Sequence, residues 1–386
     1  MGLFDWLTRK PSLGKFAESL VAGLQAAGDT RQFQYDRDKS RLLYEGGEIN
    51  LGAMFAEHCQ LSKSQRGDHL NVMVRAMLPA PPLPEDFADA SHDLRPRIWA
   101  RKTLSHLDAD KLPPHHAVGS HLTATLVYDL PDSVRTIAET ELEAWGVNYY
   151  EALEVARAQL TQDNFMFASI GGSVHCSITG DTYDASRLLL VELIRRLSVK
   201  GTPIAMVPQR DQLFLTGSDD VDGLRLILKR AEDGYREAAR PLCPLPLRLD
   251  DDQWVDWMPD GTHPLYQEFR DFELKVLYGD YEEQKTELEE LHGESVFVAT
   301  FAAAQKDDRL VSFSTWSKGV PTLLPKTQRV GLVDPERKDV VASGPWEHVQ
   351  SVVGHLMKQT DDYPARYLVE EFPTDDQLAA IGKEEP

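Results

Sequence analysis

Apolar and polar positions change their period along the chain, and each change predicts an element. In residues 15–27 the apolar side chains recur every three or four positions, which is typical of a helix with one buried face. Residues 33–44 instead alternate as two strands around a polar turn, the pattern of a hairpin. Two further helical stretches follow, residues 51–57 and 69–77. The sequence therefore predicts an N-terminal α-β-β-α unit over residues 1–80.

The central region, residues 95–258, has the most regular pattern. Strand-like and helix-like runs follow one another as hairpin, helix, hairpin, helix, which predicts an α+β fold with helices packed on a largely antiparallel sheet. The predicted strands are residues 121–130, 165–178 with a two-residue hairpin turn at Gly171-Gly172, 203–217 with a second turn, and 246–258. The predicted helices are residues 133–145, capped by Ser133 and stopped by Gly146, then 149–160, 184–199 and 221–239. Residues 202–207 and 213–217 are apolar on both faces, so we expect their strands at the centre of the sheet.

The pattern changes on either side of this region. Residues 78–93 are rich in proline, which cannot sustain a helix, and indicate a linker or a surface loop. Residues 262–380 begin with an acidic helix over 266–294 and continue with three strand-like runs and a helix over 344–357. We interpret the acids of the first helix as a solvated face, with a cation or a basic partner as the alternative. The sequence thus predicts a smaller C-terminal α+β unit.

Charge and cysteine content narrow the possible partners and the compartment. The 386 residues carry 41 Lys and Arg against 62 Asp and Glu, a formal net charge of -21. This charge repels nucleic acid phosphates and anionic lipids, and the strongest basic stretch, residues 95–102, is too short to reverse it locally. Three cysteines, an odd number, fit a reducing compartment. The sequence shows no signal peptide and no apolar run of about 18 residues, so we expect a cytoplasmic protein without a membrane span or a nucleic acid partner.

The first residues contain a small apolar group, Leu3, Phe4 and Trp6, ahead of the positive pair Arg9-Lys10. We expect a first helical turn docked on the body of the protein. The alternative is a peg that contacts a partner or a membrane surface.

The candidate chemistry is concentrated in the run TGDTYDASRLLL, residues 179–190. Gly180 and Asp181 are typical of a turn, because Asp binds its own downstream backbone and Gly tolerates unusual φ. Asp184 stands where a helix N-cap belongs, with Arg187 one turn further on to pair with it. This interpretation makes the aspartates structural, each binding amide hydrogens close to itself in the chain.

The alternative is an active site built from the same acids. Asp181, Asp184 and Asp211 all lie at predicted loop ends, where sites are usually built, and His175 is available as a base. Paired carboxylates share a proton or hold a divalent cation, and Asp181 and Asp184 are the candidate metal ligands. The chain would then be a hydrolase or a metal-dependent enzyme.

Other chemistry finds less support. The dipeptides His58-Cys59 and His175-Cys176 suggest zinc, but neighbours on a strand point to opposite faces and the sequence has no C-x-x-C. His115-His116 indicates an exposed loop. The standard motifs of serine hydrolases, phosphate-binding loops, zinc proteases and dinucleotide-binding folds are missing, and no cofactor is predicted. Trp254 and Trp257 are three residues apart and face opposite ways on a strand, so we expect one in the core and the other exposed. Core packing is the interpretation for the tryptophans, and a recognition groove lined by Trp254 and Trp257, or by Trp316 with Pro321, is the alternative.

These central motifs resemble the YtpQ-like family, domain of unknown function 1444. TGDTYDASRLLL is similar to that family's acidic-tyrosine-Asp-Ala-Ser-Arg run, and MVPQRDQLFLTG to its Val-Pro-x-x-Asp strand-turn-strand. HLTATLVYDL and FQYDRDKSRLLY are consistent with it, and the resemblance covers residues 15–258, with Thr182 where the family carries Gly. The resemblance implies a bacterial cytoplasmic protein and brings no established activity.

Two functions follow from these observations. The first is a non-enzymatic protein-binding or accessory module, whose sheet and acidic helix contact another protein. The negative charge, the missing catalytic motifs and the added C-terminal unit favour it. The second is the hydrolase or divalent-metal enzyme that uses the acidic turns of the central region.

Overall fold

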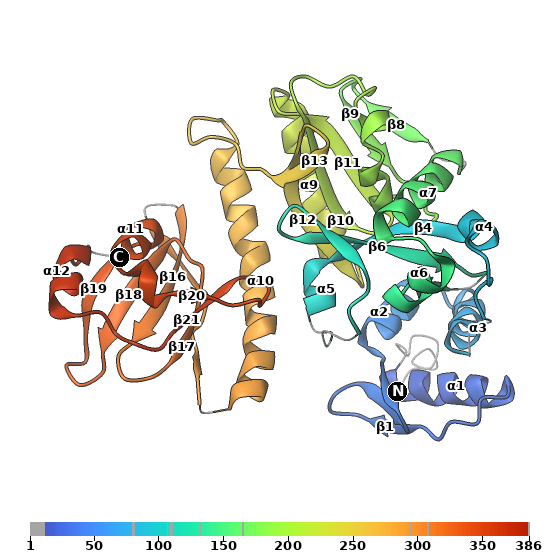
Figure 1. Cartoon of the computed structure of the whole chain (residues 1–386), viewed down its shortest axis with the longest axis horizontal. Coiled ribbons are helices and arrows are strands. Elements are labelled where there is room, and N and C mark those ends of the chain that lie inside the picture. Colours follow the sequence, from blue (N-terminus) through green and yellow to red (C-terminus); the bar gives the residue numbers. More distant parts are fainter. Residues whose placement is uncertain are drawn as a thin grey trace, which may run out of the picture.

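The computed structural model describes residues 12–78, 82–105, 107, 111–131, 133–163, 166–293, 295–306 and 309–384. Leu3, Phe4 and Trp6 lie outside these residues. The chain is an α+β protein, and the strands of the described residues form five sheets. Figure 1 shows an N-terminal group of elements below a central group, with a C-terminal group beside them on the far side of one long helix.

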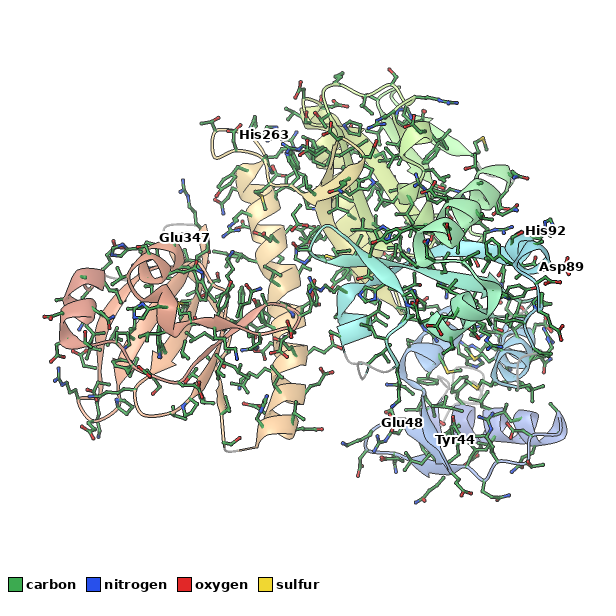
Figure 2. The ribbon with its side chains drawn as sticks, in the orientation of Figure 1. Tyr44, Glu48, Asp89, His92, His263 and Glu347 are labelled. Carbon is green, nitrogen blue, oxygen red and sulfur yellow. The ribbon has the colours of Figure 1, made fainter. Side chains whose placement is uncertain are left out.

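The N-terminal group combines three helices with a three-stranded antiparallel sheet. Its elements are α1 (Leu13–Ala26), β1 (Gln34–Asp36), β2 (Arg41–Tyr44), β3 (Gly47–Asn50), α2 (Gly52–Gln60) and α3 (Arg66–Met77). The Ser12 hydroxyl accepts a hydrogen bond from the Lys15 amide at 3.4 Å and caps α1. The predicted helices and hairpin are confirmed, whereas β3, which adds a second hairpin, was not predicted. Tyr44 and Glu48 mark this sheet in Figure 2.

A second antiparallel sheet opens the central group. Its strands are β4 (Leu94–Ala100), β5 (His115–Val118), β6 (Leu122–Asp129) and the short β7 (Val134–Thr136). The strand predicted over residues 121–130 is confirmed as β6. His115 and His116 belong to β5 and not to a loop, so that prediction is wrong. The end of the proline-rich stretch is also structured, because α4 (Phe87–Ala90) and a 3₁₀ turn (Ser91–Asp93) lead into β4.

The helix predicted from Ser133 is wrong in its first part. Helix α6 covers Glu139–Trp145 only, and Gly146 ends it with a φ of 69°, as predicted. Val134 and Thr136 form β7 instead and pair with the last residues of β6. Their β-branched side chains favour a strand, so a ladder beside β6 outweighs the cap that Ser133 would have made. Two more helices of this group are α5 (Arg101–Ser105) and α7 (Tyr149–Gln162).

The largest sheet has six antiparallel strands in the order β13-β12-β10-β11-β9-β8. They are β8 (Phe167–Ile170), β9 (Val174–Ser177), β10 (Pro203–Gln209), β11 (Gln212–Gly217), β12 (Pro241–Asp250) and β13 (Gln253–Asp256), and α9 (Val221–Glu237) packs on β10, β11 and β12. The predicted hairpins are confirmed, and β10 and β11 are central as expected. Gly171 and Gly172 both take positive φ, 61° and 82°, in a loop of residues 171–173 that is one residue longer than predicted.

The long helix predicted over residues 184–199 is wrong. The chain forms a 3₁₀ turn (Ala185–Leu189) and one short helix, α8 (Val191–Ile194). Residues 188–191 are all buried, so this apolar run marks a segment enclosed on every side and not one face of an amphipathic helix.

Helix α10 (Tyr266–His292) confirms the predicted acidic helix and lies between two cores (Figure 1). Phe269 and Phe272 join the core of the six-stranded sheet, whereas Leu274 and Tyr281 pack toward the C-terminal group. Of the acids on α10, Asp280 is buried and the others are exposed or partly exposed. Among the described residues, no helix combines the length and the apolar character needed to cross a bilayer.

The C-terminal group contains two four-stranded sheets and two helices. Its elements are β14 (Phe297–Val298), β15 (Ala302–Lys306), β16 (Arg309–Ser317), β17 (Thr322–Pro325), β18 (Arg329–Asp334), β19 (Asp339–Pro345), α11 (Trp346–Val353), a 3₁₀ turn (Gly354–Leu356), β20 (Lys358–Gln359), β21 (Arg366–Val369) and α12 (Asp375–Ile381). Trp316 is buried here, and Trp254 is buried in the central group, as the core interpretation predicts. Trp257 packs against the same central core and is only partly buried.

Candidate functional site

Asp184 is one of the acids singled out from the sequence. It is fully buried, and it accepts hydrogen bonds from residues that precede it in the chain. Its carboxylate accepts hydrogen bonds from the Ser177 hydroxyl at 2.5 Å, the Thr179 amide at 2.8 Å and the Gly180 amide at 2.7 Å. The predicted N-cap is therefore wrong, because these amides lie upstream and Asp184 makes no cap hydrogen bond to the turn that follows. Asp184 still accepts hydrogen bonds from backbone amides close to it in the chain, and these bonds close the turn after β9.

Arg187 joins Asp184 to Asp181. Its Nη1 donates to Asp181 Oδ1 at 3.0 Å and to Asp184 Oδ1 at 3.1 Å, and its Nη2 donates to Asp181 Oδ2. Burial raises the pKa of the Asp181 carboxyl, but the Arg187 hydrogen bond and charge, helped by the Tyr183 amide, outweigh it and hold the pKa below its ordinary value. The predicted pairing of Arg187 with Asp184 is confirmed, and both carboxylates are engaged with one guanidinium.

His175 lies on β9, and both its ring nitrogens have partners. Ser169 Oγ on β8 is 2.8 Å from Nδ1, and the Ser198 carbonyl oxygen is 2.9 Å from Nε2. A carbonyl only accepts, so in the neutral ring Nε2 carries the proton and Nδ1 accepts from the Ser169 hydroxyl. Ser169 is an exposed residue, its hydrogen bond to His175 is partly buried, and the ring itself is buried. The sequence pattern indicates His175 as a candidate base and gives no sign of this serine.

Asp211 lies in the β10–β11 turn, which a hydrogen bond from the Ala185 amide to the Arg210 carbonyl at 2.9 Å fixes beside the acidic turn. Its Oδ2 is 3.5 Å from Arg210 Nε, and its buried Oδ1 has no hydrogen-bond partner in the described chain. The structure thus brings Asp181 and Asp184 together on Arg187, whereas Asp211 lies in the neighbouring β10–β11 turn and His175 lies on β9.

A metal site is not evident in this arrangement. Within the part of the chain that the structure describes, no group of three or more His, Cys, Asp or Glu side chains is placed to hold an ion. The catalytic and metal-binding interpretations of these aspartates stay predictions.

Arg97 on β4 is the buried charge that the sequence analysis missed. Its side chain is 8% exposed, with its guanidinium carbon 5.1 Å from the ring centre of Trp99 and 5.9 Å from that of Tyr183. Among the described residues no carboxylate forms an ion pair with it, and the Tyr183 hydroxyl is a polar neighbour of its guanidinium. Burial lowers the pKa of Arg97, the Tyr183 hydroxyl opposes that shift, and the charges of Arg210 and Asp211 lower and raise it in turn. The alternation Arg95, Arg97, Trp99 places these three side chains on one face of β4, a signal that the sequence contains.

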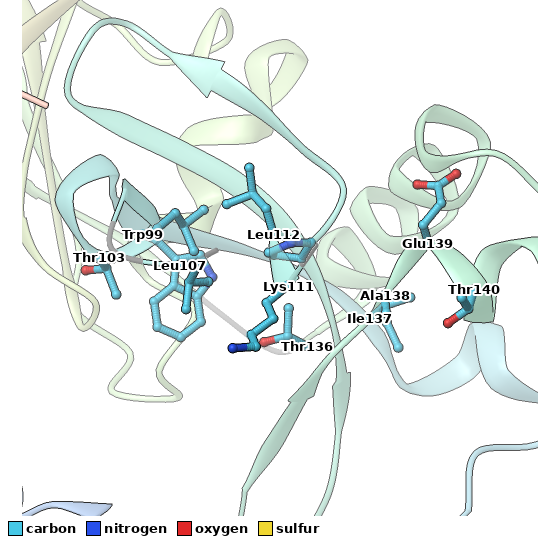
Figure 3. Close-up of a pocket in the computed structure, with 12 residues that line it drawn as sticks. Trp99, Thr103, Leu107, Lys111, Leu112, Thr136, Ile137, Ala138, Glu139 and Thr140 are labelled. Atoms are coloured by element: carbon cyan, nitrogen blue, oxygen red, sulfur yellow. The ribbon is translucent and has the colours of Figure 1, made fainter. Parts of the chain in front are cut away.

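A cavity of about 430 Å³ opens on the same sheet and includes Trp99 in its wall (Figure 3). Its lining is mostly apolar, with Leu104, Leu112 and Ile137 beside the polar groups of Thr136. Trp99 donates its indole N–H to Thr125 Oγ1 at 2.8 Å, so the ring is held in place between this cavity and Arg97.

The sequence is similar to a bacterial protein. The UPF0354 protein lwe1624 of Listeria welshimeri is 25% identical over 248 residues, which cover 60% of this chain and 90% of that protein. No family model matches the chain, and no solved structure matches it. The similarity supports an uncharacterised bacterial family and does not by itself specify the YtpQ-like one.

Proposed function

We propose that this chain is a non-enzymatic accessory protein of the bacterial cytoplasm that binds another protein. The observation that carries the proposal is the outer edge of the six-stranded sheet. Strand β8 is the last strand of that sheet, and among the described residues no further strand is paired with its outer side. Such an edge is a template for pairing with an added strand.

The β8 edge exposes apolar side chains and carries no charged residue, whereas most exposed sheet edges are protected by charges or proline. Met166 before β8, Ile170 at its end and Ile178 after β9 are 74%, 44% and 57% exposed. Residues 166–180 contain no Asp, Glu, Lys or Arg, although 27% of the whole chain is charged. Natural proteins usually place charges or proline on an exposed edge to prevent pairing. The missing protection favours an edge that pairs in the cell.

A second edge of the molecule shows the usual protection. Strand β19 ends a four-stranded sheet, but the C-terminal segment lies along it. The Ser343 amide donates to the Gly382 carbonyl at 2.9 Å, and the Glu384 amide donates to the Ser343 carbonyl at 3.1 Å. Lys383 also pairs with Asp339 at the start of β19. The chain therefore covers this edge and leaves β8 open.

The occupant that fits is an extended segment of a partner protein, rich in β-branched or aromatic residues, added to β8 as another strand. Main-chain hydrogen bonds supply affinity in such pairing, and apolar side chains next to Ile170 and Met166 supply specificity. The negative charge elsewhere on this chain favours partners whose flanking residues are basic.

Substitution of Ile170 by Lys tests this proposal, with Val72→Lys on α3 as a control of similar exposure. Each variant and the wild type capture partners from a bacterial lysate, and the captured complexes are then analysed by hydrogen exchange. We expect a partner that the wild type and Val72→Lys retain and Ile170→Lys loses, and new protection of the β8 amides in its complex. Retention by Ile170→Lys, or a dimer of this chain as the species that protects β8, would contradict it.

The contact between Ser169 and His175 favours a second candidate function, a hydrolase with Ser169 as nucleophile and His175 as base. A serine hydroxyl that donates to an imidazole, itself oriented by a carbonyl, supplies the first two parts of a catalytic triad. A fluorophosphonate probe distinguishes the candidates, because it labels only an activated serine. Labelling of the wild type that Ser169→Ala abolishes and Ser173→Ala retains would favour the hydrolase. Equal labelling of all three proteins, or none, removes it.

The three-part domain division, residues 1–80, 95–258 and 262–380, stays a prediction. Separate buried clusters in the N-terminal and C-terminal groups support it. Two contacts argue against an independent C-terminal part. The Tyr363 hydroxyl lies 2.7 Å from His121 Nδ1 of the central group, and Lys102 Nζ donates a hydrogen bond to Asp280 on α10 at 2.9 Å.

A further inference from the structure

The cavity that includes Trp99 in its wall has the size and the lining of a small-molecule site. Its volume of about 430 Å³ lies within the roughly 300–1,000 Å³ that ligand pockets occupy (Figure 3). One side of the cavity comes from α5 and the chain that follows it, and the other from the end of β7 and the start of α6. These segments are separate in the sequence, so only the folded chain forms the cavity.

The cavity combines a buried floor with an exposed apolar mouth. Leu104 and Ile137 are buried, whereas Leu107 and Leu112 are 42% and 37% exposed. A single exposed leucine is ordinary on a protein surface, but these two line the same cavity. A molecule that binds between them removes apolar surface from water on both side chains, and this burial favours binding.

Trp99 contributes a fixed aromatic ring to the lining. Its indole N–H donates to Thr125 Oγ1 at 2.8 Å, so the ring keeps this orientation at no risk to a neighbouring donor. The guanidinium carbon of Arg97 lies 5.1 Å from the centre of the ring, so the indole already interacts with one cation. A second cation that approached the ring from the cavity would be repelled by Arg97. An uncharged aromatic ring packs against the indole without that repulsion.

The charges of the lining disfavour an anion as well. Lys111 and Glu139 are the charged members of the described lining, and their charges cancel. The net charge of -21 on the whole chain repels anions. The hydroxyls of Thr103, Thr136 and Thr140 donate or accept hydrogen bonds, so the lining provides partners for one polar group of a ligand.

We propose that this cavity binds a small uncharged aromatic compound of the phenol or indole type. The ring of the ligand packs against Trp99 and the exposed leucines Leu107 and Leu112, and its O–H or N–H donates to a threonine hydroxyl of the lining. The cavity shares no residue with the β8 edge, so this site is independent of the proposed protein binding.

Isothermal titration calorimetry at pH 7 with three probes of different charge tests the proposal. The probes are 2-naphthol, which is uncharged, the anion 2-naphthoate and the cation phenyltrimethylammonium. We expect one saturable site for 2-naphthol, with an enthalpy that becomes more negative as temperature rises, because burial of apolar surface lowers the heat capacity. We expect each ion to bind about tenfold more weakly or not at all, because Arg97 repels the cation and the net charge repels the anion.

Two alanine variants locate the binding site. Ala138→Trp fills the cavity from its wall, and Ala158→Trp places the same side chain at an exposed position of α7 as the control. We expect the first variant to lose the binding of 2-naphthol and the second to keep it, with the circular dichroism of both unchanged. Trp99→Leu keeps an apolar contact and removes the aromatic ring, so it should weaken binding about three- to tenfold.

The opposite results overturn the proposal. The absence of a saturable site for 2-naphthol in the wild type does so, as does binding that survives Ala138→Trp. Loss of binding in both tryptophan variants overturns the assignment to this cavity, since Ala158 is not part of its lining. An ion that binds as tightly as 2-naphthol overturns the choice of an uncharged ligand, and unchanged binding by Trp99→Leu overturns the role of the ring.

Discussion

Arg187 and Arg97 lie on either side of Tyr183 and represent two ways of burying the same charge. The Arg187 amide donates to the Tyr183 carbonyl, and its guanidinium is enclosed by Asp181 and Asp184. The Arg97 guanidinium faces the Tyr183 ring, and no carboxylate of the described residues forms an ion pair with it. A buried charge that the chain compensates is part of the framework. One that the chain leaves uncompensated, at a cost in stability, is a candidate for binding something else.

The largest expected effect is the loss of Arg187. Arg187→Met leaves the fully buried Asp184 without its cation, so we expect a fall in the free energy of unfolding of about 3–5 kcal/mol. Arg97→Met should change it by less than about 1 kcal/mol in either direction. Urea unfolding at pH 7 measures both. Similar losses in the two variants would erase the distinction between them.

The next largest effect on the free energy of unfolding should come from changing the Asp184 carboxylate to an amide. In Asp184→Asn one oxygen becomes an NH₂ group that faces backbone N–H donors at Thr179 or Gly180, so a donor meets a donor. We expect a loss of about 2–3 kcal/mol in the same unfolding measurement. Asp181→Asn, at a side chain that is partly exposed, should cost less. The reverse order would place the main support of the turn at Asp181.

A smaller effect should appear in the dependence of stability on pH. The pKa of Asp181 is lower in the folded chain, so its contribution is fully present above the ordinary aspartate pKa, about 3.9, and is lost as pH falls through the folded value. We expect Asp181→Asn to show a shallower loss of stability in that acid range than the wild type. Parallel curves for the two proteins would show that Asp181 does not contribute.

The smallest expected effect is that of divalent cations. Since Arg187 already neutralises Asp181 and Asp184, we expect magnesium, manganese, calcium and zinc to leave Tm unchanged within about 1 °C. A saturable rise that Asp181→Asn abolishes would favour the metal-dependent enzyme over the structural turn.

Local patterns predicted most elements of the fold, and the errors share one cause. The helix and hairpins of residues 13–44 and the central pair β10–β11 follow from periods of 3.6 and 2. The predicted helices at Ser133 and Asp184 failed because β6 offered a strand partner to Val134, and because burial on all sides removed the need for an amphipathic helix at residues 188–191.

Some features of the candidate site were also predictable from local sequence and others were not. Asp181, Asp184 and Arg187 are close in sequence, so a turn in which they meet was predictable, although the direction of the Asp184 hydrogen bonds was not. Ser169 was missed because only the β8–β9 register sets it opposite His175.

The sequence by itself determined the α+β pattern, the strong negative charge and the local ion pair of the acidic turn, since each depends on residues near one another in the chain. Only the tertiary structure decided that Arg97 would be buried against Trp99 and Tyr183 without an ion pair among the described residues, and that β8 would be the last strand of its sheet. Burial and strand order depend on contacts between segments that are distant in the sequence. The residues of one segment therefore do not predict which other segments will pack against it.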